Sequence, residues 1–255
     1  MKALKASYQL TIKDRIRSLA AALPDDAFLK GVLTSTALIQ KAMEEDECIF
    51  FVVYGPVRYG KTAYAMKTLA QIHQTWNPEI LQKYIVFKPE DFIKKLKTLR
   101  QLGKQSLLVW EDAGVWLHCM KWNDPLVIAI SKYLDVSGTD WGGIMFTTPL
   151  PTHVIKRVRG LPDCITVKII KEKDDPNKPR TANGYKMSML PDMKKSLCKP
   201  VFNDRFSALM PNVFYNWYQN YRRAMTDDQF KEVEENLYKY MTKEQEGGLP
   251  INENL

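Results

Sequence analysis

The chain has 255 residues, of which 45% are hydrophobic and 26% are charged. This balance is typical of a folded globular protein and excludes the polar, aromatic-poor composition of a disordered chain. The net charge of +8 fits nucleic acid as a partner. No apolar run approaches the roughly 20 residues that span a bilayer, so we expect a cytoplasmic protein with no membrane partner.

The amino-terminal region is predicted to form two helices that cap the core. Apolar residues recur at helical spacing up to Leu23, after Thr11, a residue type that caps helix starts. A second helical pattern follows Pro24 and reaches Met43. We assign residues 1–48 to this N-terminal helical segment.

Five apolar runs of strand length alternate with helical segments in the middle of the chain. They are CIFFVVYG at 48–55, KYIVFK at 83–88, SLLVWED at 106–112, GGIMFTT at 142–148 and CITVKII at 164–170. Strands that alternate with helices favour a parallel sheet wound by right-handed crossovers. We therefore predict an α/β fold, a three-layer sandwich with a parallel five-stranded sheet, over residues 49–172.

The remaining residues, 173–255, are predicted to form a basic loop and a small, mainly helical C-terminal region. The stretch EKDDPNKPRTANGYK at 172–186 is typical of an exposed loop or hairpin tip. Between Pro151 and Pro200, twelve Lys and Arg face five Asp and Glu, a net charge of +7. This concentration indicates either a nucleic-acid contact surface or an ordinary solvated surface. Two further helices are expected, the second capped by Thr226.

One motif predicts phosphate binding. The segment Gly55-Pro56-Val57-Arg58-Tyr59-Gly60-Lys61-Thr62 fits the P-loop pattern G-x-x-x-x-G-K-[ST] in full, between a predicted strand and a predicted helix. The glycines let backbone N–H groups surround a phosphate, at the positive end of the following helix. Lys61 would reach the β- and γ-phosphates and the Thr62 hydroxyl would hold Mg²⁺. The sequence therefore predicts a P-loop NTPase.

Two adjacent carboxylates, Glu111 and Asp112, end the strand LLVW about fifty residues further along. Hydrolysis needs an acid that supports the metal and a base that activates water. By position, Glu111 would support Mg²⁺ and Asp112 would polarise the water. The alternative is a solvated acidic pair at a strand end.

Polar and basic residues follow the next strand. Thr147 and Thr148 are the last residues of this strand. A hydroxyl there would orient the attacking water or contact the γ-phosphate. The alternative is that the two threonines have no role in the site. Arg157 and Arg159 lie in HVIKRVRG. Each is a candidate arginine finger for a neighbouring subunit, a DNA contact or an idle surface charge.

Together these motifs resemble those of an AAA+ ATPase of the replication-initiator and helicase-loader branch, the DnaA/DnaC/IstB type. The resemblance covers residues 25–170, with GPVRYGKT as Walker A, LLVWED as Walker B, FTT as sensor 1 and HVIKRVRG as the arginine-finger helix. It implies ATP, Mg²⁺, a homo-oligomeric ring with shared sites, and action on DNA or on a DNA-bound helicase or other replication or recombination protein. The chain departs from the pattern in its Glu-Asp order and in lacking a clear sensor 2 arginine. In style it also resembles small ATPases of archaeal viruses and plasmids.

The leading functional hypothesis is an ATP-hydrolysing protein that binds DNA and remodels it, or loads a partner onto it, in replication or mobile-element maintenance. Three alternatives remain. One is a DNA-translocating or packaging ATPase of the FtsK/HerA class, which normally has Gln or Asn after the sensor strand. Another is a small-molecule phosphotransferase, and the third is a non-hydrolysing, ATP-dependent assembly module. The chain has no Asn-Lys-x-Asp motif that reads guanine, so GTP is disfavoured.

Overall fold

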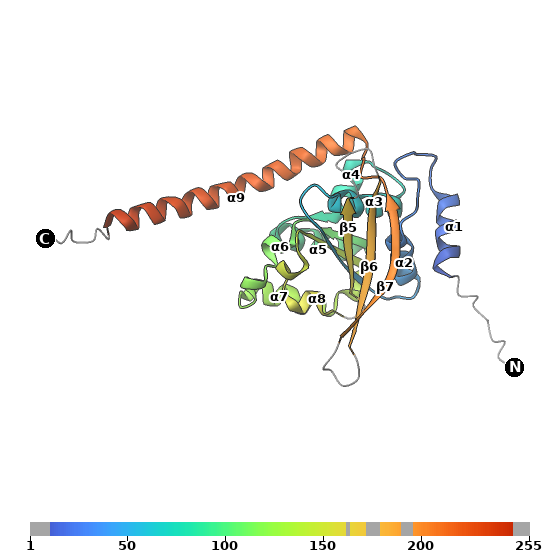
Figure 1. Cartoon of the computed structure of the whole chain (residues 1–255), viewed down its shortest axis with the longest axis horizontal. Coiled ribbons are helices and arrows are strands. Elements are labelled where there is room, and N and C mark those ends of the chain that lie inside the picture. The colour runs from blue at the N-terminus through green and yellow to red at the C-terminus, as the bar shows by residue number, and fades with distance from the viewer. Residues whose placement is uncertain (1–10, 162–163, 172–178, 190–195, 247–255) are drawn as a thin grey trace, which may run out of the picture. The chain divides into compact units, whose positions relative to one another are not determined.

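The computed structural model describes residues 11–161, 164–171, 179–189 and 196–246. The chain divides into two compact units, Met1–Pro211 and Asn212–Leu255. The first unit contains one mixed sheet with helices on both faces, and the second contains a single long helix (Figure 1). The three-part division predicted from the sequence stays a prediction. Within the described ranges, no helix has both the length and the apolarity needed to cross a bilayer.

The sheet has seven strands in the order β2-β3-β4-β1-β5-β6-β7. These strands are β1 (Ile49–Tyr54), β2 (Ile85–Val86), β3 (Gln105–Trp110), β4 (Trp141–Thr148), β5 (Ile165–Lys171), β6 (Arg180–Met189) and β7 (Ser196–Phe206). The first five strands in this order are parallel, whereas β6 pairs antiparallel with β5 and β7 antiparallel with β6. The α/β fold is confirmed, and the five predicted runs form the five parallel strands.

The prediction of only five strands is wrong, because part of the expected basic loop forms strand β6. The strand RTANGYKMSM carries no apolar run and is interrupted by Gly184, beside which the ladder has a bulge. A Cβ at Gly184 would lie 2.4 Å from the ring of Phe202, so the missing side chain lets that ring cover the strand. The part of the expected loop at 172–178 lies outside the described residues.

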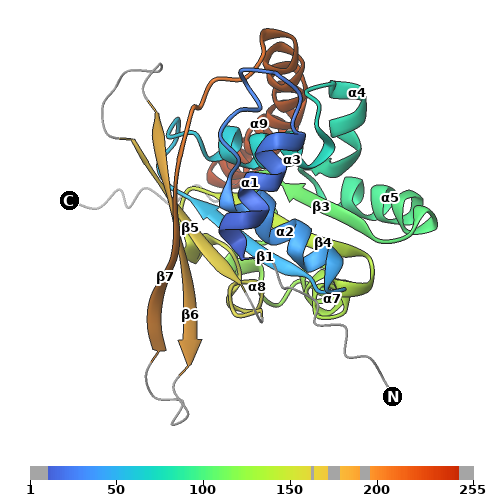
Figure 2. The same cartoon turned by 90° about the vertical axis from the view of Figure 1, so that its right-hand side faces the viewer.

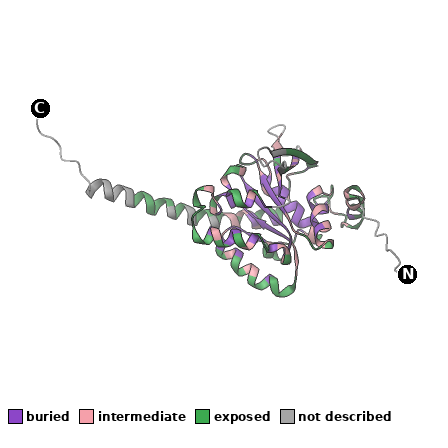
Figure 3. Cartoon of the chain, turned by 90° about the horizontal axis from the view of Figure 1, so that it is seen from below, coloured by how far each residue is buried: buried purple, intermediate pink, exposed green. Residues whose placement is uncertain are grey.

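Helices cover the two faces of the parallel strands (Figure 2). They are α1 (Ile12–Ala22), α2 (Thr34–Glu44), α3 (Lys61–His73), α4 (Pro78–Leu81), α5 (Pro89–Leu99), α6 (Ala113–Trp116), α7 (Pro125–Leu134) and α8 (Lys156–Arg159). Short 3₁₀ turns connect them at Gln82–Tyr84, Arg100–Leu102, Cys119–Lys121, Ser137–Thr139 and Pro151–His153. Helices α2 and α3 pack on one face, and α5, α7 and α8 contribute to the apolar core on the other. Figure 3 shows the buried strands between these more exposed helices.

The amino-terminal helices differ in extent from the prediction. Helix α1 begins after Thr11, whose hydroxyl accepts a hydrogen bond from the Asp14 backbone N–H, as the capping pattern predicts. Helix α2 begins only at Thr34, later than the pattern following Pro24 indicates. In the second unit, α9 (Asn212–Glu246) is one helix, not two. The Thr226 hydroxyl does not cap a new helix but donates to carbonyls of the preceding turn, at Arg222 and Arg223.

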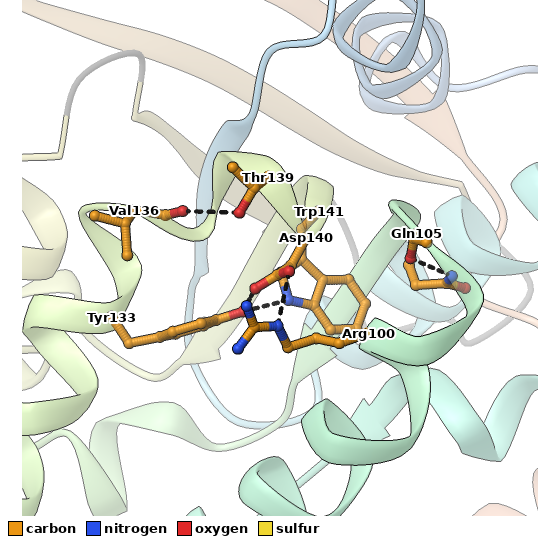
Figure 4. Close-up of polar contacts among 8 residues, drawn as sticks. Arg100, Gln105, Tyr133, Val136, Thr139, Asp140 and Trp141 are labelled. Carbon is orange, nitrogen blue, oxygen red and sulfur yellow. Dashed lines mark hydrogen bonds and ion pairs between the residues drawn. The ribbon is translucent and has the colours of Figure 1, made fainter.

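A polar cluster fixes the amino-terminal end of strand β4 (Figure 4). The Tyr133 hydroxyl donates to Asp140 Oδ2 at 2.7 Å and accepts from Trp141 Nε1 at 3.1 Å. Arg100 Nε donates to Asp140 Oδ1 at 3.0 Å, which adds an ion pair from the end of α5. These bonds join helix α7 to the amino-terminal end of β4. Thr147 and Thr148 lie at the other end of the same strand.

Candidate nucleotide-binding site

The P-loop runs from the end of β1 into the first turn of α3. Gly55 has φ of 151°, and a Cβ there would lie 2.9 Å from the Ile169 carbonyl oxygen, so the neighbouring strand β5 leaves no room for a side chain. Gly60 has φ of 99° and occupies the N-cap position of α3. These two glycines have the conformations that let a loop turn tightly into a helix. Pro56, Val57 and Arg58 are exposed, and Arg58 also has a positive φ of 65°.

Lys61 lies across its own loop. Its Nζ donates to the carbonyl oxygens of Gly55 at 2.8 Å and Pro56 at 3.0 Å, and only 9% of the residue is exposed. These bonds hold the ammonium group above the loop whose backbone would surround a phosphate. The N-terminus of α3, a helix of 13 residues, points at the same place.

Thr62 and Glu111 come together beside the loop, although 49 positions separate them. The Thr62 hydroxyl donates to Glu111 Oε2 at 2.8 Å, and Glu111 is 1% exposed at the carboxyl end of β3. A hydroxyl and a carboxylate are the hard oxygen ligands that Mg²⁺ prefers. The pair therefore fits Mg²⁺. Among the described residues, no group of three or more His, Cys, Asp or Glu side chains could hold a metal, so the remaining ligands would be water and phosphate oxygens.

Asp112 and Thr147 also meet at this edge of the sheet. The Asp112 backbone N–H donates to Thr147 Oγ1 at 2.9 Å, and Asp112 has a left-handed φ of 49° before α6. Strained positive φ values at non-glycine residues cluster at functional sites. Thr148 instead donates to the Leu150 carbonyl oxygen at 2.9 Å. Thr147 thus supports the acidic pair, whereas Thr148 bonds within its own turn.

The two candidate finger arginines lie away from the P-loop of their own chain. Arg157 forms an ion pair with Asp135, at the end of α7, and Arg159 Nε donates to the Val154 carbonyl oxygen at 2.8 Å. Both arginines lie on α8, near the lower end of the sheet in Figure 1, whereas α3 lies near its upper end. Their predicted role thus requires a second copy of the chain.

Sequence reasoning missed the residues that border the loop on its β5 side. A Cβ at Gly60 would lie 3.3 Å from Ala208 Cβ, 3.6 Å from Arg180 Cγ and 3.8 Å from Phe206 Cζ. Lys171 Nζ lies 6.0 Å from the centre of the Tyr59 ring. No local signal marks these residues, because they adjoin the loop only once β6 and β7 extend the sheet.

Comparisons with known proteins give limited matches. No protein-family model matches the chain. The chain is 26% identical over 117 residues to "Uncharacterized protein B-251" of Sulfolobus spindle-shape virus 1, over 42% of this chain and 46% of that protein. The match thus spans less than half the length of this viral relative. Among solved structures, the N-terminal domain of zonular occludens toxin from Neisseria meningitidis aligns with a TM-score of 0.36 and 14% identity, over 62% of this chain and 95% of that one.

Proposed function

We propose that the protein is an ATPase that binds DNA and uses ATP hydrolysis to remodel it or to load a partner onto it. One observation supports the ATPase part of the proposal: Lys61, Thr62 and Glu111 lie around one loop. Asp112 follows Glu111 at the carboxyl end of β3. The initiator and helicase-loader branch stays a prediction from the order of the motifs.

The residues divide the chemistry among them. The loop backbone and Lys61 bind and orient the β- and γ-phosphates. Thr62 and Glu111 would hold Mg²⁺, which would neutralise charge on the phosphate oxygens. Asp112 accepts a proton from, and orients, the attacking water, and its backbone is fixed by Thr147. The reversed Glu-Asp order therefore assigns the metal to the carboxylate that contacts Thr62.

The DNA part of the proposal rests on charge. Exposed basic side chains include Lys168 on β5 and Lys199 on β7. Together with the net +7 between Pro151 and Pro200, they offer a surface for phosphate contacts. The partner protein, the ring and a cytoplasmic site of action belong to this proposal.

Turnover by the purified chain tests both parts. We expect Asp112→Asn to lower ATP hydrolysis by about 100-fold or more, since a positioned general base contributes a factor of this size. Glu111→Gln should lower it as well, because an amide replaces the carboxylate proposed to bind the metal. The exposed Glu79 supplies the control, and Glu79→Gln should hydrolyse ATP like the wild type. DNA should change the turnover rate and should bind less tightly as salt is raised.

The possible results separate the candidate functions. A wild type that binds ATP without turnover would favour the non-hydrolysing assembly module, which the reversed acidic order makes a genuine second candidate. If DNA leaves the rate of ATP turnover unchanged and shows no salt-dependent binding, the proposed DNA binding would be contradicted, but the proposed ATPase activity would not. Directional displacement of a roadblock on duplex DNA would instead favour a translocating ATPase.

A further inference from the structure

A buried arginine borders the P-loop on the side away from the acidic pair. Arg180 is the first residue of β6 and is 3% exposed. Its Cγ lies 3.6 Å from the position that a Cβ of Gly60 would occupy. The guanidinium carbon is three bonds beyond Cγ, so the side chain is long enough to bring its charge to a phosphate bound in the loop. A guanidinium beside the loop can bind phosphate oxygens through both hydrogen bonds and opposite charge.

The strand that carries Arg180 is fixed to the P-loop helix by its neighbour in the sheet. Arg180 lies opposite Phe206 on β7, and the Phe206 ring packs edge-on against Tyr64 of α3, with 5.1 Å between ring centres. The Tyr64 hydroxyl donates to Asp204 Oδ2 at 3.0 Å, two residues earlier on β7. The end of the β6–β7 pair is therefore held in place against α3, so Arg180 has a fixed position relative to Gly60.

The order of the strands gives the phosphate chain a direction. Glu111 and Asp112 follow β3, which lies beyond β4 on one side of β1, whereas β5 and β6 lie on the other side. The metal and the γ-phosphate belong at the Glu111 end of the loop, because Thr62 and Glu111 meet there. The α-phosphate and the nucleoside then extend toward β5 and β6. Lys171, directly opposite Arg180 on β5, adds a second cation beside the Tyr59 ring.

We infer that Arg180 is a nucleotide-binding residue that contacts the α- and β-phosphates from the β6 side of the P-loop of its own chain. This inference rests on the proposed nucleotide site and extends it to the antiparallel strands. Arg180 then recognises the diphosphate part common to ATP and ADP, on the side opposite Lys61 and Mg²⁺. A planar guanidinium suits this task because it binds two phosphate oxygens at once.

Titration of a fluorescent ADP analogue into the full-length chain tests the inference. Arg180→Gln should weaken ADP binding about tenfold or more, as expected for the loss of charge-assisted hydrogen bonds. Arg205→Gln is the matched control, since Arg205 lies on β7 opposite Thr181, one step along the ladder, and is exposed on the other face. Its ADP affinity should equal that of the wild type. Arg180→Lys keeps the charge and should lose less affinity than Arg180→Gln.

Salt dependence separates a phosphate contact from a purely structural role. The dissociation constant of the wild type should rise more steeply with salt than that of Arg180→Gln, because the variant lacks one of the charges that attract the phosphates. An Arg180→Gln protein that folds and binds ADP like the wild type, with the same salt dependence, would overturn the inference alone. If that variant fails to fold, an ADP affinity of Arg180→Lys equal to that of the wild type would overturn it, because an ammonium group lacks the planar fork by which a guanidinium binds two phosphate oxygens. A wild type that binds no nucleotide would overturn the proposed function as well.

Discussion

Asp204 is a buried carboxylate that joins β7 to two helices. Its Oδ2 accepts from the Thr34 backbone N–H at 2.8 Å and from Tyr64 at 3.0 Å, and its Oδ1 accepts from the Thr34 hydroxyl at 2.5 Å. Burial raises the pKa of Asp204 above its ordinary value of 3.8, outweighing the hydrogen bonds from Thr34 and Tyr64, which lower it. The folded protein therefore binds this proton more tightly than the unfolded chain does.

The raised pKa makes the stability contribution of Asp204 depend on pH in an unusual direction. The contribution is fully present below pH 3.8 and is lost as the pH rises through the folded-state pKa. We expect the free energy of unfolding of the wild type, relative to Asp204→Asn, to fall as the pH rises from 3.8 through the raised pKa of Asp204. Urea unfolding of both proteins at several pH values measures this difference.

An exposed aspartate provides the comparison for Asp204. Lys30 lowers the pKa of Asp25 by a hydrogen bond and by its charge, so any stability from Asp25 is present above pH 3.8 and lost as the pH falls. Asp25→Asn should thus shift the pH dependence in the opposite sense. Parallel curves for the wild type and Asp204→Asn would contradict the raised pKa.

At the scale of single elements, strand β4 depends on the polar cluster at its start (Figure 4). Tyr133→Phe would remove the acceptor of Trp141 Nε1 and a donor to Asp140, and Trp141 is 1% exposed. Leaving a buried donor without its partner costs about 1–3 kcal/mol of stability. Denaturant unfolding should show this loss of stability. ATP turnover per folded molecule should stay unchanged, because the cluster lies at the amino-terminal ends of the strands and the P-loop lies at their carboxyl ends.

A tyrosine on α9 serves as the control for this change. Tyr215 is 46% exposed, so Tyr215→Phe should alter the free energy of unfolding by no more than about 0.5 kcal/mol. If Tyr133→Phe were as stable as Tyr215→Phe, the cluster would not contribute to holding β4 in place.

The elements that sequence patterns predicted are those with the strongest local signal. The parallel strands β1 to β4 are buried over most of their length, so their sequences form apolar runs, and β4 is buried at all eight positions. Strands β6 and β7 were missed because their exposed faces are polar and Gly184 breaks the pattern. The single helix α9 was divided because Thr226 looks like a cap in the sequence but bonds back into the preceding turn.

The candidate site was predictable to the same extent. Gly55 to Thr62 form a continuous motif, and Glu111 ends a strand, so the sequence alone identified both. The contact between Thr62 and Glu111 follows from parallel strands that end at one edge. Arg180 was not predictable, because it meets Gly60 across 120 positions and through strands with a weak pattern.

At the scale of the whole molecule, we propose that Arg157 or Arg159 acts on the active site of a neighbouring subunit, because both lie on α8, away from the P-loop of their own chain (Figure 1). A protomer without its finger arginine and a protomer carrying Asp112→Asn should each be inactive alone. Mixed at equal amounts, they should regain activity at about a quarter of the interfaces, where an intact loop meets an intact arginine. Single Arg157→Ala and Arg159→Ala proteins, assayed alone and mixed with Asp112→Asn, measure this.

Two outcomes would contradict a shared site. Full ATP turnover by both arginine variants alone would show that neither arginine acts on a neighbouring subunit. Mixtures that stay inactive, although each protein is folded and assembled, would leave no support for an arginine supplied by a second copy.

The two carbonyl bonds of Lys61 have a consequence for how tightly a nucleotide can bind. A free lysine side chain loses conformational entropy worth up to about 2 kcal/mol when it is fixed by a ligand. Here the Gly55 and Pro56 carbonyls already restrict it before any phosphate arrives. The lysine is thus preorganised, and more of its attraction for phosphate remains as binding affinity.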